Sequence, residues 1–254
     1  MIILLPIFHS LSSIVQQVWV QYALIILELL LLIFLFEILP LVFGVRSSFK
    51  KNFTDFIHFQ FLRGIFSITL LLVFFVGIKK FGINEGYIDI TGLSDVVQAV
   101  ILFVYAEFFI YICHRGAHVF KIPLITKAHK FHHTVTSDLD WINARKEHNL
   151  IISLFVFIFS ALFFIVFKSS PMSHSITLAL FLILLSFSHY KVPISVPYLD
   201  KVFLFPRDHR RHHTQRSGPF GVSLSLFDTL FGTRSENVKQ SETSANQKHN
   251  QKER

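Results

Sequence analysis

Charged residues are scarce in this chain. They make up 16% of its 254 residues, whereas a soluble domain usually carries about a quarter. Hydrophobic residues make up 52%, and the mean hydropathy is +0.53. The apolar residues also collect into long runs, which is typical of segments that cross a bilayer. These features argue against a soluble globular protein and favour an integral membrane protein.

Cysteine is nearly absent as well. Cys113 is the only one, so an intramolecular disulfide is excluded. It lies inside an apolar run, where a small buried hydrophobic side chain is the simplest interpretation. The chain also lacks an HExxH motif, in which the glutamate is the general base of a zinc protease. The sequence therefore excludes a disulfide-stabilised domain and argues against a membrane zinc protease.

Apolar runs predict the fold class. Five runs are present, at about residues 20–43, 56–78, 96–113, 150–167 and 176–187. The connections richest in lysine and arginine, at residues 46–51, 115–145 and 201–216, fall on one side of the membrane if the runs alternate, and such loops are usually cytoplasmic. We therefore expect an all-α, multi-pass transmembrane helical bundle of four to five spans. The net charge of +8 is attributed to the membrane surface, and no nucleic acid partner is expected.

Composition divides the chain into three parts. Residues 1–95 are predicted to form an N-terminal transmembrane region, and residues 96–233 a catalytic domain that contains a membrane hairpin. Residues 234–254 are polar, with almost no apolar side chains, and predict a disordered tail. Within the first run, Glu28 and Glu37 are expected to have structural or interfacial roles, because a carboxylate in a membrane span must be paired or lie near an interface.

Histidine clusters carry the predicted chemistry. Of 14 histidines, eight fall into three clusters, one HxxxH and two HxxHH: His114 and His118; His129, His132 and His133; His209, His212 and His213. On a helix these spacings place imidazoles on one face. Eight ligands exceed the four that a tetrahedral zinc ion takes and suit two metal ions with open positions. Imidazole binds zinc, copper, iron and nickel. A nearly all-histidine site beside a bilayer favours redox chemistry, and hence iron.

Four further residues are candidates for the same site. His148 and His189 lie at the ends of apolar runs, where they are expected either to bind metal or to support the ligands. Ligating histidines usually donate their other ring nitrogen to a carboxylate or carbonyl. Asp208, beside His209, and Glu107, acting through Tyr111 or water, are predicted to fill that role. The remaining histidines are isolated and are predicted not to bind metal: His9, His58, His174 and His249.

These motifs resemble the fatty acid hydroxylase / sterol desaturase family. The likeness runs from about residue 96 to 233 and includes the three clusters and the closing Phe231-Gly232-Thr233. It implies a di-metal site on the cytosolic side of the membrane helices, with the eight clustered histidines, His148 and His189 as ligands. It also implies O₂, an external electron donor and a lipid substrate. Residues 218–221 and 227–228 depart from the family's Asn-Tyr-Gly and Trp-Asp pattern, so the lipid is not identified.

The predicted function is therefore an O₂-dependent di-iron oxidoreductase that hydroxylates or desaturates a membrane lipid, such as a sterol or fatty acyl chain. Its cofactors would be two iron ions, with zinc as an alternative in isolated protein, and no catalytic side chain is assigned beyond the metal ligands. A separate electron-transfer protein is expected to dock on a basic surface formed by Lys127, Lys130, Arg210 and Arg211. The alternative is that this surface binds lipid headgroups. The alternatives are a membrane metal transporter, whose ligands would lie mid-span, and a non-catalytic, metal-binding member of the family.

Overall fold

Two long apolar helices organise the structure, a computed structural model that describes residues 26–27, 30–42, 44–45, 54, 86–120, 123–134, 139–142, 158 and 165–234. Helix α5 (Asp95–Val119) and helix α8 (Pro171–Ser188) are each long and apolar enough to cross a membrane. Helix α8 begins at a favourable site, since Pro171 occupies its first turn and the Ser170 side chain accepts a hydrogen bond from Ser173 N at 3.0 Å.

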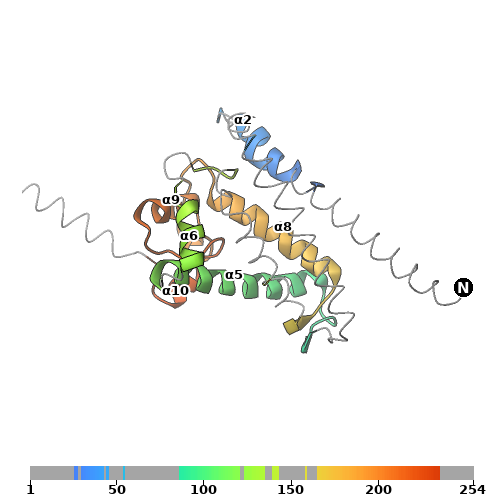
Figure 1. Cartoon of the computed structure of the whole chain (residues 1–254). Coiled ribbons are helices and arrows are strands. Elements are labelled where there is room, and N and C mark those ends of the chain that lie inside the picture. Colours follow the sequence, from blue (N-terminus) through green and yellow to red (C-terminus); the bar gives the residue numbers. More distant parts are fainter. Residues whose placement is uncertain are drawn as a thin grey trace, which may run out of the picture.

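A short parallel sheet sets the direction of both helices. Strand β1 (Ile88–Asp89) pairs with strand β2 (Phe167–Lys168), with Ile88 opposite Phe167. Each strand leads through a short connection into one long helix, and α5 and α8 start at the same end and run the same way (Figure 1). Ser170 N donates to Gln98 Oε1 at 2.8 Å and joins the two helix starts. The C-terminal ends of the helices, which carry histidines, therefore also share one end of the molecule.

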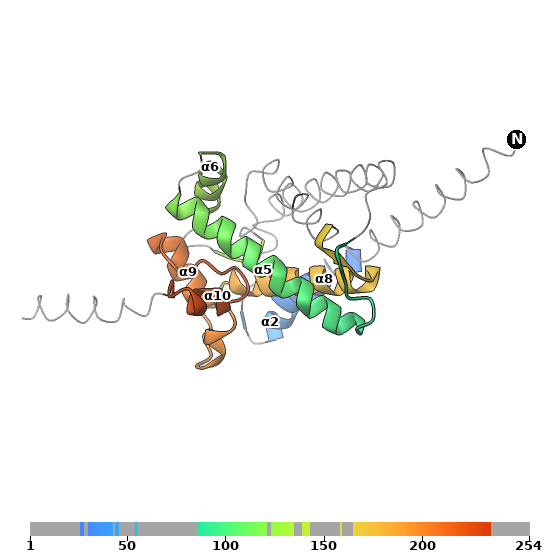
Figure 2. The same ribbon diagram turned by 90° about the horizontal axis from the view of Figure 1, so that it is seen from below.

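The shorter helices gather at that histidine-bearing end. Helices α6 (Pro123–His132), α9 (Pro206–Gln215) and α10 (Leu226–Leu230) lie there in both views (Figures 1 and 2). The 3-10 helix η4 (Leu199–Lys201) leads into α9. Helices α6 and α9 begin with proline, whose fixed φ suits the first helical turn and whose missing N–H would have no helical partner there.

The N-terminal described segment packs against the same end. It contains an apolar helix, Leu30–Val42, which includes a π-helix, η1 (Phe34–Ile38), followed by α2 (Leu39–Val42). Phe36 packs with Trp141 and Tyr190 in a buried cluster. Glu37 is buried and its Oε1 accepts a hydrogen bond from Trp141 Nε1 at 2.8 Å. This contact is the kind of structural role that the sequence predicts for Glu37.

The described residues test only part of the predicted topology. The runs at 96–113 and 176–187 lie in α5 and α8, and α5 continues beyond its run to Val119. The run predicted to end at 167 ends differently, because Phe167 belongs to β2. The run at 56–78, most of the run at 150–167 and residues 235–254 lie outside the described residues. The described part of the chain is thus mostly helical with two membrane-length helices, and the count of four to five spans stays a prediction.

Candidate metal centre

Each histidine cluster occupies a helix, as the spacing predicts. His114 and His118 lie in the last turns of α5, where the helix continues unbroken from the apolar run. The second cluster lies at the end of α6, and His133 extends its helical hydrogen bonding by donating from its backbone N to His129 O at 3.0 Å. The third cluster lies on α9. His189 caps the C-terminus of α8.

Among the described residues, nine histidines converge into two groups. The five-histidine group consists of His114, His118, His129, His133 and His212. The four-histidine group consists of His132, His189, His209 and His213. Within each group the candidate ligand nitrogens all lie within 4.8 Å of one another. The structure therefore brings together all eight clustered histidines and His189, whereas His148 lies outside the described residues.

The HxxHH helices each serve both groups. Helix α6 directs His129 and His133 to the five-histidine group and His132 to the four-histidine group. Helix α9 does the reverse, since only its middle member, His212, joins the five-histidine group. The two groups are consequently adjacent, and the His132 and His133 ring centroids are 5.6 Å apart. This arrangement suits a pair of neighbouring metal ions.

The Nε2 atoms face one another at short range. His129 Nε2 lies 3.0 Å from that of His114, 2.7 Å from that of His118 and 2.8 Å from that of His133. In the four-histidine group, the Nε2 atoms of His189 and His209 are 2.8 Å apart. The character of each contact depends on which ring nitrogen carries the proton.

Backbone carbonyls around the two groups determine which ring nitrogen of a histidine carries the proton. The Nδ1 atoms of His114, His212 and His189 donate to carbonyl oxygens at 2.7, 2.7 and 2.9 Å, those of Phe220, Ser217 and Leu185. A carbonyl oxygen only accepts, so in a neutral ring each Nδ1 carries the proton and each Nε2 presents a lone pair inward.

Inward lone pairs fit a bound cation. The Nε2 atom of His212 is buried and has no hydrogen-bond partner among the described residues. Several converging lone pairs without protons between them repel one another, and a bound metal ion would remove this repulsion because the lone pairs would coordinate it. The donors are all imidazole, which suits iron, zinc, copper or nickel. The residues present therefore fit a metal ion in each group.

Burial keeps these imidazoles neutral. It lowers the pKa of His133 to about 4. Burial, helped by neighbouring histidines, holds the pKa values of His209 and His212 well below the ordinary histidine range. A metal ligand must be the neutral ring with a free lone pair. The described geometry thus supplies the binding form at neutral pH.

Glu107 acts on a loop rather than directly on a histidine. Its buried Oε2 accepts hydrogen bonds from Ser223 N at 3.2 Å and Leu224 N at 3.0 Å. The predicted route through Tyr111 is not seen, because the Tyr111 hydroxyl is hydrogen-bonded to Thr233 Oγ1 at 3.0 Å. Glu107 therefore holds the segment that follows Phe220, whose carbonyl accepts from His114.

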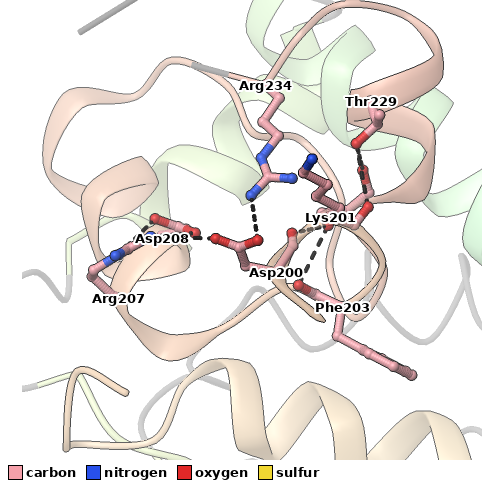
Figure 3. A network of polar contacts seen from close by, with 8 residues as sticks. Asp200, Lys201, Phe203, Arg207, Asp208, Thr229 and Arg234 are labelled. Atoms are coloured by element: carbon pink, nitrogen blue, oxygen red, sulfur yellow. Dashed lines mark hydrogen bonds and ion pairs between the residues drawn. The ribbon is translucent and has the colours of Figure 1, made fainter. Parts of the chain in front are cut away.

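The prediction that Asp208 orients His209 differs from the structure. The Asp208 carboxylate accepts from Arg207, with Oδ1 3.1 Å from Nε (Figure 3). The Nδ1 atom of His209 has no hydrogen-bond partner among the described residues. Consecutive helical residues point about 100° apart, so adjacency in sequence turns the carboxylate away from the ring. Asp208 instead belongs to a network in which Asp200 pairs with Arg207 and Arg234.

Asp228 is a buried carboxylate that the sequence did not single out. It is fully buried and accepts hydrogen bonds from Phe220 N and Gly221 N, each at 2.7 Å, and from Thr233 Oγ1 at 2.6 Å. Burial raises its pKa, against these three hydrogen bonds, which lower it. Two sequence signals pointed to it: Asp228 stands in the place of the aspartate in the family's Trp-Asp pattern, and it comes shortly before the closing Phe-Gly-Thr.

The predicted docking surface also needs correction. Arg210 Nη2 donates to the carbonyl oxygens of Leu139 and Lys191, each at 3.0 Å, so this guanidinium is occupied inside the structure. Lys127 and Lys130 are exposed. Of the residues predicted for docking, Arg210 therefore has a structural role, and docking of an electron-transfer protein stays a prediction.

Comparison with known proteins identifies the family. A family model described as fatty acid hydroxylase matches residues 99–233, which is more than half of the chain. The chain belongs to the fatty acid hydroxylase family. The matched range of this fatty acid hydroxylase family member contains all nine grouped histidines and Asp228. No curated protein and no solved structure matches the chain significantly. The resemblance inferred from the histidine clusters is thereby confirmed.

Proposed function

We propose that this protein hydroxylates a membrane lipid with O₂ at a di-iron centre. The observation that carries the proposal is the pair of adjacent all-histidine groups at the shared end of two membrane-length helices. Membership of the fatty acid hydroxylase family supports the substrate class and the reaction type. Desaturation of the same lipid is the alternative outcome, because both reactions begin with removal of hydrogen from an unactivated carbon.

The chain's own residues hold and shield the proposed centre. Five histidines would bind one iron ion and four the other, and His148 is the proposed tenth ligand. Bound iron would supply activation of O₂ for attack on a C–H bond. The backbone carbonyls that accept from the Nδ1 atoms fix the ring orientations. His209, His212 and His213 are at most 1% exposed, which limits water in the site.

Helix direction supports a multi-pass topology. Helices α5 and α8 run the same way, and two parallel spans require an odd number of crossings between them. The apolar run at 150–167 supplies one such crossing. With the histidine-bearing end beside the basic connections, we place the site on the cytoplasmic side. The lipid would then enter from the bilayer, and a separate electron-transfer protein would dock near Lys127 and Lys130, both of which are exposed.

Metal transport is less well supported. A transporter holds its ion near the middle of the membrane. Here His114 and His118 lie in the last turns of α5, and His189 lies at the C-terminus of α8. Both positions are at the ends of membrane-length helices. An enzyme that works on lipid at the membrane surface accounts for this placement better.

The test is a comparison of cellular lipids by mass spectrometry under ¹⁸O₂, in a host with a competent electron donor. The wild type is compared with a His132→Ala, His133→Ala double variant, which removes one histidine from each group. The matched control is His174→Ala. This histidine lies outside both groups, near the start of α8, with its Nε2 atom 2.9 Å from Ser169 Oγ.

A lipid that carries one ¹⁸O with the wild type and the control, and not with the double variant, supports hydroxylation and names the substrate. A product that has lost two hydrogens without gaining label assigns desaturation instead. Identical lipids in all three strains would overturn the proposed function.

A further inference from the structure

We infer that Asp228 is a positioning residue for the five-histidine group alone, acting through the loop at residues 217–224. The inference rests on the proposed function only in that the histidine groups bind metal. Below, this segment is called the 217–224 loop.

The 217–224 loop supplies the outer contacts of two candidate ligands. Phe220 O accepts from His114 Nδ1, and Ser217 O accepts from His212 Nδ1, both at 2.7 Å. These histidines come from different helices, α5 and α9, and both belong to the five-histidine group. In the four-histidine group, by contrast, the Nδ1 atom of His189 lies 2.9 Å from Leu185 O on its own helix. The loop therefore orients ligands of one group.

Asp228 fixes the loop where it matters for His114. Its Oδ1 accepts from Phe220 N, and its Oδ2 accepts from Gly221 N. The peptide unit between these two nitrogens contains the Phe220 carbonyl. Holding both nitrogens therefore sets the direction of that carbonyl, and with it the plane and the protonated nitrogen of the His114 ring.

Close packing around the 217–224 loop leaves no room for a side chain at Gly221. A Cβ atom on Gly221 would lie 1.9 Å from Leu224 O and 2.9 Å from Asp228 Oδ2. Gly232 has φ of 64°, a left-handed turn that favours glycine. This turn returns the chain so that Thr233 Oγ1 donates to Asp228 Oδ1 at 2.6 Å. The closing Phe-Gly-Thr motif thus anchors the carboxylate that anchors the loop.

The expected consequence is a loss of affinity for one metal ion of two. Removing an outer contact of a metal-binding histidine typically weakens metal affinity about 10–100-fold. In Asp228→Asn, one oxygen is kept, but an amide N–H₂ group faces a backbone N–H donor, either that of Gly221 or that of Phe220. The loop then shifts at Phe220, while the Leu185 contact of His189 is untouched.

The experiment uses the full chain in detergent micelles, titrated anaerobically with ⁵⁷Fe(II) alone. Iron bound per chain is measured, and Mössbauer spectra report the iron environments. We expect two irons in the wild type. In Asp228→Asn we expect one iron bound as in the wild type and the other about 10–100-fold more weakly, recovered at excess iron. The matched control is Asp200→Asn, because Asp200 pairs with Arg207 and Arg234 (Figure 3) and its side chain makes no described contact with the loop.

A second variant, Gly221→Ala, displaces the loop without removing a polar group and should show the same selective loss. Two irons bound with wild-type affinity in both variants would overturn the inference. So would equal weakening of both irons in variants that remain monodisperse. If the wild type binds two irons and the variants give either of these contrary results, the inference about Asp228 fails and the proposed function stands. A wild type that binds no iron defeats the metal centre and the inference together.

Discussion

Arg210 links the third histidine cluster to two other segments, and its removal gives a quantitative test of the fold around the site. Its Nη2 atom donates to Leu139 O and Lys191 O at 3.0 Å each, and to Tyr190 O at 3.4 Å. Tyr190 and Lys191 directly follow His189. Arg210→Met keeps the apolar part of the side chain and removes every donor, so these carbonyls lose a charged partner.

The magnitude follows from the two shorter contacts. A hydrogen bond to a charged group contributes about 1.5–3 kcal/mol to stability. The two bonds share one nitrogen on a half-buried side chain, so their contributions are not additive, and we expect a total loss of about 2–4 kcal/mol. For a chain of this size, each kcal/mol lowers the melting temperature by about 2–4 °C. The expected shift is therefore about 5–15 °C.

The assay is heating in detergent micelles, followed by size-exclusion chromatography of the protein that stays monodisperse. Arg210→Lys should fall near Arg210→Met, because lysine lacks the planar fork that reaches several carbonyls. Lys130→Met is the matched control, since Lys130 is exposed and its loss changes the charge equally. The reasoning would be refuted if the melting temperature of Arg210→Met lay within about 2 °C of that of the control, which is well below the expected shift. A weaker salt dependence of reduction in Arg210→Met would restore Arg210 to the docking surface.

Three further outcomes are expected. Glu107→Gln should keep two irons by metal analysis. Only Oε2 accepts from the loop, and the amide oxygen can replace it, while Oε1 has no hydrogen-bond partner among the described residues. Glu107→Ala should lower iron content, because it leaves two backbone N–H groups without an acceptor at a cost of about 1–3 kcal/mol each. Trp141→Phe should lower stability by about 1.5–3 kcal/mol, measured by the same heating assay, because Glu37 loses its indole donor; an unchanged melting temperature would contradict this. Lys127→Glu with Lys130→Glu should slow reduction by an acidic donor and reduce its salt dependence in stopped-flow traces; unchanged traces would remove these lysines from the docking site.

The histidine clusters were predictable because their information is local. Spacings of three and four residues place side chains on one helical face wherever the helix sits, and α5, α6 and α9 have the expected form. His189 was predictable as a candidate from its place at the end of an apolar run. The split into groups of five and four was not, because it depends on how α6 and α9 face each other.

The supporting carboxylates were harder to predict because their partners are set by tertiary contacts. Glu107 accepts from Leu224, 117 residues away in the chain, and no spacing rule connects them. Asp208 is adjacent to His209 in sequence and still points elsewhere. From the sequence, Arg210 was predicted to belong to a basic surface, yet its guanidinium donates hydrogen bonds to three carbonyl oxygens that are distant in the chain. In each case the type of residue was informative, whereas its partner required the fold.

The position of Asp228 so near the end of the matched range has a consequence for synthesis. Every grouped histidine precedes residue 214, but the carboxylate that holds Phe220 and Gly221 is translated after all of them. A nascent or truncated chain that stops at Leu224 would carry all nine grouped histidines without that restraint. Premature termination between residues 214 and 228 would therefore leave the candidate ligands intact and still impair the proposed centre.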